Sequence, residues 1–70
     1  MKTRFVKGRI YRLNKSQTGH SFGIPAETDN GNYCIVDCQI VDRNGNPKRG
    51  YEHPIPVQTN YIKSEVINET

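Results

Sequence analysis

Turn-forming residues divide this chain into short segments, and that division constrains the fold more than any other feature of the sequence. Asn, Asp, Gly and Pro gather in four clusters, at 14–19, 25–32, 43–50 and 54–56. The third cluster contains Asn-Gly, the strongest short-range signal for a hairpin. The runs of strand type between these clusters are 5–13, 21–24, 33–41 and 56–62, with a last short strand or a frayed turn of helix at 63–67. No window repeats apolar residues every 3.6 positions over the length that a stable helix needs.

Short strands separated by turns about every ten residues predict an all-β fold. Because closure removes exposed strand edges, we expect a small five-stranded barrel, either oligonucleotide-binding-like or SH3-like. Pro54 and Pro56 restrict their segment to an edge strand or an extended connection. The 70 residues make a single domain, in which we expect residues 1–4 and 68–70 to be frayed.

Basic residues are concentrated near the N-terminus. Six of the ten lie within the first fifteen positions, with no acid among them: Lys2, Arg4, Lys7, Arg9, Arg12 and Lys15. If residues 5–13 form a strand, one face carries Phe5, Lys7, Arg9, Tyr11 and Leu13, and the other carries Val6, Gly8, Ile10 and Arg12. The second face suits a core, and the first mixes cations with rings, as a nucleic-acid surface does. The same charges also suit a solvated edge strand or contact with an acidic protein surface.

Residues 7–24, KGRIYRLNKSQTGHSFGI, resemble the opening of a cold-shock domain, whose pattern is roughly K-G-x-V-K-W-F-N, a turn, then K-G-F-G-F-I. The matching positions, with one residue inserted in the turn and one beside Gly23, are Lys7, Gly8, Ile10, Asn14, Gly19, Phe22 and Ile24. The resemblance implies a five-stranded oligonucleotide-binding barrel whose first two strands stack the bases of single-stranded RNA or DNA. The chain departs from the pattern at Arg12, where the family has a stacking Trp, and at His20, where it has a Phe. The family's third-strand rings and His are also missing from 34–38.

The sequence therefore predicts a small nucleic-acid-binding protein that takes single-stranded RNA or DNA on a basic and aromatic strand face. The residues expected at this interface are Lys7, Arg9, Tyr11, Arg12, His20, Phe22, Arg43, Lys48 and Arg49. The cations would meet phosphates and the three rings would stack on bases, while a guanidinium can also stack. Each ring can equally be a packing residue, and the loop cations can be unpartnered. The alternative function is a protein-interaction module or small inhibitor that docks on a larger protein and presents 53–57 for strand addition.

Other functions lack support in the sequence. Cys34 and Cys38 lie about 13 Å apart on one strand face, too far for a disulfide, so we expect free thiols in the core. The same spacing argues against a zinc site shared with His20 or His53. There is no nucleophile signature, carboxylate pair or Gly-rich phosphate loop, so we expect neither an enzyme nor a cofactor. Without a bilayer-length apolar stretch or a secretion signal, we expect no membrane partner and a cytoplasmic protein.

Overall fold

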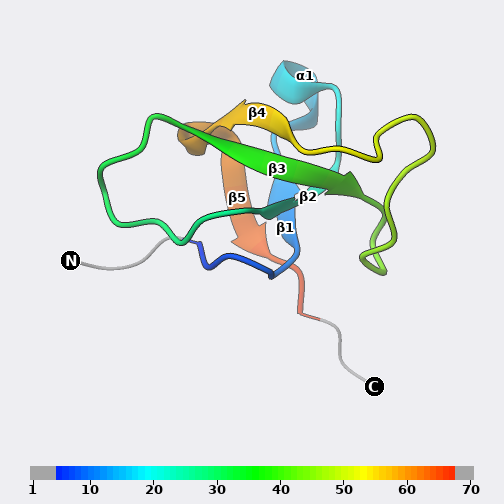
Figure 1. Cartoon of the computed structure of the whole chain (residues 1–70), viewed down its shortest axis with the longest axis horizontal. Coiled ribbons are helices and arrows are strands. Elements are labelled where there is room, and N and C mark those ends of the chain that lie inside the picture. The colour runs from blue at the N-terminus through cyan, green and yellow to red at the C-terminus, as the bar shows by residue number, and fades with distance from the viewer. Residues whose placement is uncertain (1–4, 68–70) are drawn as a thin grey trace.

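Five short strands form one antiparallel sheet in the computed structural model, which describes residues 5–67 (Figure 1). The strands are β1 (Tyr11–Leu13), β2 (Phe22–Pro25), β3 (Ile35–Val41), β4 (Ile55–Gln58) and β5 (Ile62–Glu65). The helical segments are one turn of α-helix, α1 (Lys15–Thr18), and a 3₁₀ turn, η1 (Thr59–Tyr61). The strand order is β4-β3-β2-β1-β5, so a four-strand meander is followed by a fifth strand that returns beside the first. The prediction of an all-β fold is confirmed.

The turn clusters lie where the sequence predicts them, although two segments differ in detail. The cluster at 14–19 contains α1, which ends at Gly19 in the left-handed conformation that favours glycine (φ 78°). The run at 56–62 is not a single strand, because η1 interrupts it and sends the chain to the opposite edge of the sheet. Pro56 indeed belongs to an edge strand, since β4 pairs with β3 alone, and Pro54 lies in the connection just before it.

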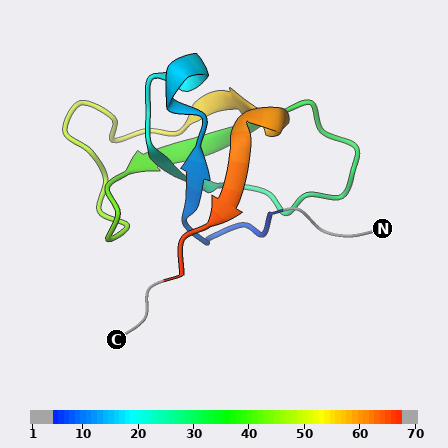
Figure 2. The ribbon, with the colours of Figure 1, turned by 180° about the vertical axis from the view of Figure 1, so that it is seen from behind.

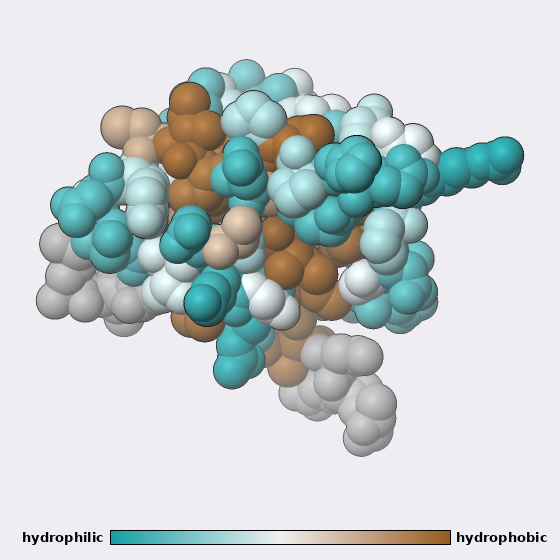
Figure 3. All heavy atoms as spheres, in the orientation of Figure 1, coloured by the Kyte–Doolittle hydropathy of each residue, from teal (hydrophilic) through white to brown (hydrophobic). Residues whose placement is uncertain are grey.

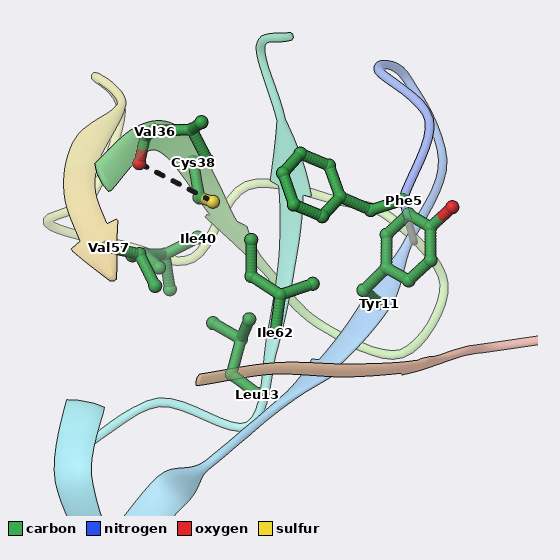
Figure 4. Close-up of a cluster of buried hydrophobic side chains, with 8 residues drawn as sticks. All are labelled: Phe5, Tyr11, Leu13, Val36, Cys38, Ile40, Val57 and Ile62. Carbon is green, nitrogen blue, oxygen red and sulfur yellow. Dashed lines mark hydrogen bonds between the residues drawn. The ribbon is translucent and has the colours of Figure 1, made fainter. Parts of the chain in front are cut away.

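The sheet is curled, and the core lies inside the curl. In both ribbon views β1 and β5 run steeply across β3 (Figures 1 and 2). Side chains from β3 and β4 meet those of β1 and β5, with Phe5 from the preceding segment (Figure 4). The buried cluster consists of Phe5, Tyr11, Leu13, Val36, Cys38, Ile40, Val57 and Ile62. The edge strands β4 and β5 are not paired with each other in the described chain, so the sheet is not closed.

The prediction of one strand over 5–13, with its aromatic face outward, is wrong. The chain turns at residues 6–9, where Arg9 N–H donates to the Val6 carbonyl, and the strand begins only at Tyr11. Phe5, Tyr11 and Leu13 are buried, whereas Val6 and Arg12 are exposed. The two large rings remove more apolar surface from water than Val6, Gly8 and Ile10 can, so a core this small takes the rings. The turn carries Lys7 and Arg9 out to solvent.

The alternation predicted for 33–41 is confirmed from Val36 to Ile40, but Val41, predicted on the opposite face, is also fully buried. Val36, Cys38 and Ile40 are buried, and the Cys38 thiol donates a weak hydrogen bond to the Val36 carbonyl over 3.9 Å (Figure 4). Cys34 precedes β3 and is exposed, so its prediction as a core residue is wrong, although both thiols are free as expected. Hydrophilic side chains cover most of the face shown in Figure 3, with apolar atoms between them in separate places. The expectation of frayed ends at 1–4 and 68–70 lies outside the described residues, as do Lys2 and Arg4.

Candidate nucleic-acid interface

The outer face of β1 and β2 brings a cation over a ring. Arg12 and Phe22 are directly opposed in the antiparallel pairing of these strands. The guanidinium carbon of Arg12 lies 5.9 Å from the centroid of the Phe22 ring, within the range of a cation–π interaction. Arg12 is exposed and Phe22 is half-buried, so the ring is held by the sheet but still has surface available. The pair therefore offers a flat aromatic surface together with a fixed positive charge.

A bulge in β5 places further side chains opposite Arg12. Leu13 pairs with Ile62, whereas Tyr11 pairs with Glu65, so one residue of β1 faces two residues of β5. These two residues, Lys63 and Ser64, are both exposed. A β-bulge bends its strand and redirects its side chains, which in a regular strand would alternate between the two faces. Because of the bulge, Lys63 and Ser64 can both remain outside the core, next to Arg12.

These elements enclose a shallow depression of about 380 Å³, hereafter the basic depression. It is lined by Arg12, Leu13, Asn14, Lys15, Ser21, Phe22 and Lys63. The lining includes three cations and no acid, which gives the depression a positive potential that attracts anions. The Phe22 ring is its largest apolar group. The depression therefore combines a surface on which a base can stack with cations that can bind a negative charge.

Tyr11 does not belong to this interface, which corrects its prediction as a stacking ring. Its side chain is only 3% exposed and meets Phe5 edge to face, with ring centroids 6.3 Å apart. The Tyr11 hydroxyl accepts a hydrogen bond from Val6 N–H at 2.8 Å. The ring thus belongs to the core, and its polar end holds the segment that leads into β1.

His20 is half-buried, and its ring packs against a residue that sequence reasoning did not single out. It meets the exposed Tyr51 edge to face, with ring centroids 4.7 Å apart. The Gln39 side-chain amide donates a hydrogen bond to the Tyr51 carbonyl and so ties the loop between β3 and β4 to the sheet. His20 immediately precedes Ser21 of the basic depression along the chain, and the edge-to-face packing leaves no open stack of the two rings.

Lys7 and Arg9 lie outside the basic depression. Lys7 lines a second depression of about 450 Å³, which is mainly apolar and includes Gly8, Ile24, Pro25 and Pro54 in its lining. Arg9 forms an ion pair with Glu65 at 3.1 Å, in which the two side chains are 60% and 30% exposed. An exposed pair of this kind contributes little to stability, but the carboxylate offsets part of the charge that Arg9 offers to an anion.

The loop cations Arg43, Lys48 and Arg49 are exposed, and none of them lines the basic depression. They belong to the loop between β3 and β4, whose tight turn is ordered by Asp42. The Asp42 carboxylate accepts hydrogen bonds from Asn44 N–H at 2.8 Å and Asn46 N–H at 3.0 Å. These backbone donors, chiefly that of Asn46, hold the pKa of Asp42 below its usual value.

Gly45 fixes where this turn lies. Its φ of 91° is in the left-handed region that favours glycine. A Cβ at this position would also lie 3.0 Å from Ile10 Cδ1, on the residue just before β1. The turn therefore packs against the residue that leads into β1, the strand that carries Arg12.

Residues 5–67 contain no cluster of three or more His, Cys, Asp or Glu side chains that could hold a metal ion. Burial, and less so the Asp37 carboxylate, raises the pKa of Cys38 to about 12, so this thiol stays protonated at neutral pH. No helix within the described part of the chain is long and apolar enough to cross a bilayer.

Sequence reasoning identified Arg12 and Phe22 but missed Lys15 and Lys63 as partners. Lys15 follows β1 by two residues, and its place in a run of basic residues was the available signal. Lys63 joins the group only through the pairing of β5 with β1, about fifty residues apart in sequence, which local patterns do not reveal. No protein-family model, curated protein or solved structure was found that matches the chain.

Proposed function

We propose that this chain binds single-stranded nucleic acid through the outer face of β1 and β2. The observation that carries the proposal is the Arg12–Phe22 pair, a ring under a guanidinium at 5.9 Å beside two further cations. A base stacks against this pair, and the lysines of the basic depression attract the phosphates that flank it. The overall charge of +3 supports an anionic partner.

The form of the surface favours unpaired over paired bases. In a duplex the faces of the bases are covered by their neighbours, so a ring fixed in a sheet can stack only on a base that is free. Within residues 5–67 the longest helix is the single turn of α1, which is too short to lie along a major groove. Stacking on Phe22 thus requires a single strand, a loop or a frayed end.

For the fold, we propose a small partly open barrel of the SH3-like kind. Only the three residues of η1 separate β4 from β5, so the two edges approach each other at that end. An oligonucleotide-binding barrel is built on a Greek key, in which the fourth strand lies beside the first. Here β4 pairs with β3, and β5 lies beside β1. This order favours the SH3-like alternative over the barrel that the cold-shock resemblance implies.

Strand addition, the basis of the alternative function, is poorly supported by the exposed edge of β4. Thr59 N–H donates to the Cys34 carbonyl, and alternation along β4 turns the N–H groups of Val57 and Ile55 toward β3 as well. Pro56 and Gln58 therefore face outward. Because Pro56 has no N–H, β4 offers one outward donor, and proline at an edge is a feature that discourages pairing.

The proposal is tested by binding of labelled single-stranded RNA, single-stranded DNA and a duplex of the same sequence, at about 50 and 200 mM salt. Three cations that each meet a phosphate of a single strand give a salt slope of about −2, or roughly a 20-fold loss of affinity over this range. Binding of the duplex as tight as that of both single strands would contradict the proposal.

A pair of matched variants isolates the stacking ring. Phe22→Leu removes the aromatic face but keeps apolar volume, and we expect it to weaken binding of the preferred single strand by about 5- to 150-fold. Tyr33→Leu removes a ring of 39% exposure that lies outside the basic depression, and we expect less than a twofold change. Thermal melting of both variants checks that the fold is retained. An equal loss in the two variants would remove Phe22 from the interface.

A further inference from the structure

The basic depression has the size of a single-nucleotide site. Its volume of about 380 Å³ lies at the lower end of the range for small-ligand sites, about 300–1,000 Å³. Such a space holds one base with its sugar and phosphate, not a stack of several nucleotides. The single half-buried ring in its lining, that of Phe22, also matches one base.

The lining divides into a stacking part and a charged part. Phe22 and Arg12 supply the first, since the guanidinium lies over the ring. Lys15 and Lys63 supply the second, one just after β1 and the other from the bulge of β5. Within residues 5–67 the ion pair found is that of Arg9 with Glu65, so neither lysine has a carboxylate partner. Two unpaired ammonium groups beside a ring are suited to a phosphate joined to a base.

We infer that the basic depression binds one phosphorylated nucleotide, with its base stacked against the Arg12–Phe22 pair and its phosphate between Lys15 and Lys63. The inference rests on the proposed function and makes it specific. The unit recognised is a nucleotide 5′- or 3′-monophosphate, and neither a bare base nor a bare phosphate fills the site. A free mononucleotide therefore binds and competes with an oligonucleotide.

The test uses the whole chain and four probes: AMP, adenosine, ribose 5-phosphate and inorganic phosphate. Binding is followed by changes in the backbone amide NMR signals, and competition is measured against a labelled single strand. We expect AMP to bind more tightly than each of the other three, with the largest changes at Arg12, Ser21, Phe22 and Lys63. The remaining mononucleotides are run beside AMP, so that a base preference does not hide the site.

Two variants that each remove one positive charge test whether Lys63 contacts the phosphate. We expect Lys63→Gln to weaken AMP binding about tenfold and adenosine binding less than twofold, because only AMP carries the phosphate. Lys48→Gln serves as the control, since Lys48 is exposed and lies outside the basic depression. We expect it to change AMP binding less than twofold, because an exposed charge outside the depression is screened by salt.

The outcomes separate the inference from the proposed function. Oligonucleotide binding without mononucleotide binding, or AMP no tighter than adenosine, overturns the inference and leaves the proposed function standing. Equal losses in Lys63→Gln and Lys48→Gln also overturn it, because the attraction is then not local. If neither oligonucleotides nor mononucleotides bind at low salt, both fail. Tighter binding of AMP that is lost in Lys63→Gln and kept in Lys48→Gln supports the inference.

Discussion

The two sides of β1 hold residues with different roles, although those residues are neighbours in sequence. On the inner side Tyr11 and Leu13 are 3% and 5% exposed and belong to the core. On the outer side Arg12 is exposed and lies over the Phe22 ring. Burial of apolar surface stabilises the fold on the first side, whereas a guanidinium and a half-buried ring are available to a ligand on the second.

This difference means that stability and binding can be changed separately in one strand. Residues of a strand alternate between faces, so a substitution at one position leaves the neighbouring side chain on the other face. A change on the inner side should lower the free energy of unfolding without altering the binding surface of molecules that remain folded. A change at Arg12 should weaken binding without altering the free energy of unfolding. The comparison fails if either kind of change alters both the free energy of unfolding and the affinity of the folded protein.

The largest expected effect is that of Tyr11→Ala. Truncation of a buried aromatic side chain lowers the free energy of unfolding by about 3–5 kcal/mol. A 70-residue domain has roughly 3.5–10 kcal/mol in total, so we expect this variant to be largely unfolded, or to melt at much lower temperature. Circular dichroism during urea and thermal unfolding measures the loss. Arg12→Ala is the control, with an expected change within about 0.5 kcal/mol. Equal destabilisation by the two variants would contradict the assignment of inner and outer sides.

The two cysteines extend the comparison to β3. Cys34 is exposed, whereas Cys38 is fully buried with its pKa raised to about 12. We expect a thiol reagent to modify Cys34 at the rate of a free thiol and Cys38 slower by about two orders of magnitude or more, because modification awaits opening of the core. Mass spectrometry of the folded protein, with and without urea, follows the two sites. Cys34→Ser isolates the buried thiol, and rapid modification of Cys38 in that variant would show that the core opens readily.

On the outer side, Arg12→Gln should weaken single-strand binding by about tenfold while the melting temperature stays unchanged. The substitution removes the charge and the planar group over Phe22 but keeps a polar side chain in an exposed position. Arg12→Lys separates the two contributions, since it keeps the charge and loses the planar guanidinium. Fluorescence anisotropy with a labelled strand measures both variants. Wild-type affinity in Arg12→Gln would show that the ring binds without its cation.

Local patterns were sufficient for the turns and for the alternation of β3 from Val36 to Ile40, although not for Val41, which is also buried. Asn-Gly at 44–45 predicts a tight turn, and the structure has Gly45 in the left-handed conformation with Asp42 capping the turn. Val36, Cys38 and Ile40 share the buried face that period-two alternation predicts. In these segments a residue's own chemistry, or that of its near neighbours, decides the conformation.

Alternation alone could not decide which side of β1 faces inward. Within β1 the alternation of Tyr11 and Leu13 against Arg12 is correct, but the sequence assigns the rings to the ligand, whereas Phe5 and Tyr11 bury against each other. In a small core with no Trp, the large apolar groups are needed for packing before they are available for recognition. Local patterns also could not predict the whole binding site. Lys63 lies opposite Arg12 because β5 returns beside β1 with a bulge, and that pairing is a property of the tertiary fold.

The smallest expected effect concerns the acid nearest this surface along β5. Glu65 pairs with Arg9 at 3.1 Å and follows Lys63 by two residues. Glu65→Gln releases Arg9, so we expect single-strand affinity to rise by less than threefold at low salt and the gain to fade as salt screens the charge. The free energy of unfolding should change by less than about 0.5 kcal/mol, since the pair is exposed.

A matched variant distinguishes a local cause from a general one for this change. Glu27→Gln also removes one acid and likewise raises the net charge from +3 to +4, but Glu27 is exposed and forms no ion pair with Arg9. If the gain comes from Arg9, Glu65→Gln should exceed Glu27→Gln. Equal gains would instead mean that the whole charge of the domain attracts the strand and that Arg9 makes no contact with it. The contact with nucleic acid would then be confined to the basic depression, where the cations have no acid beside them.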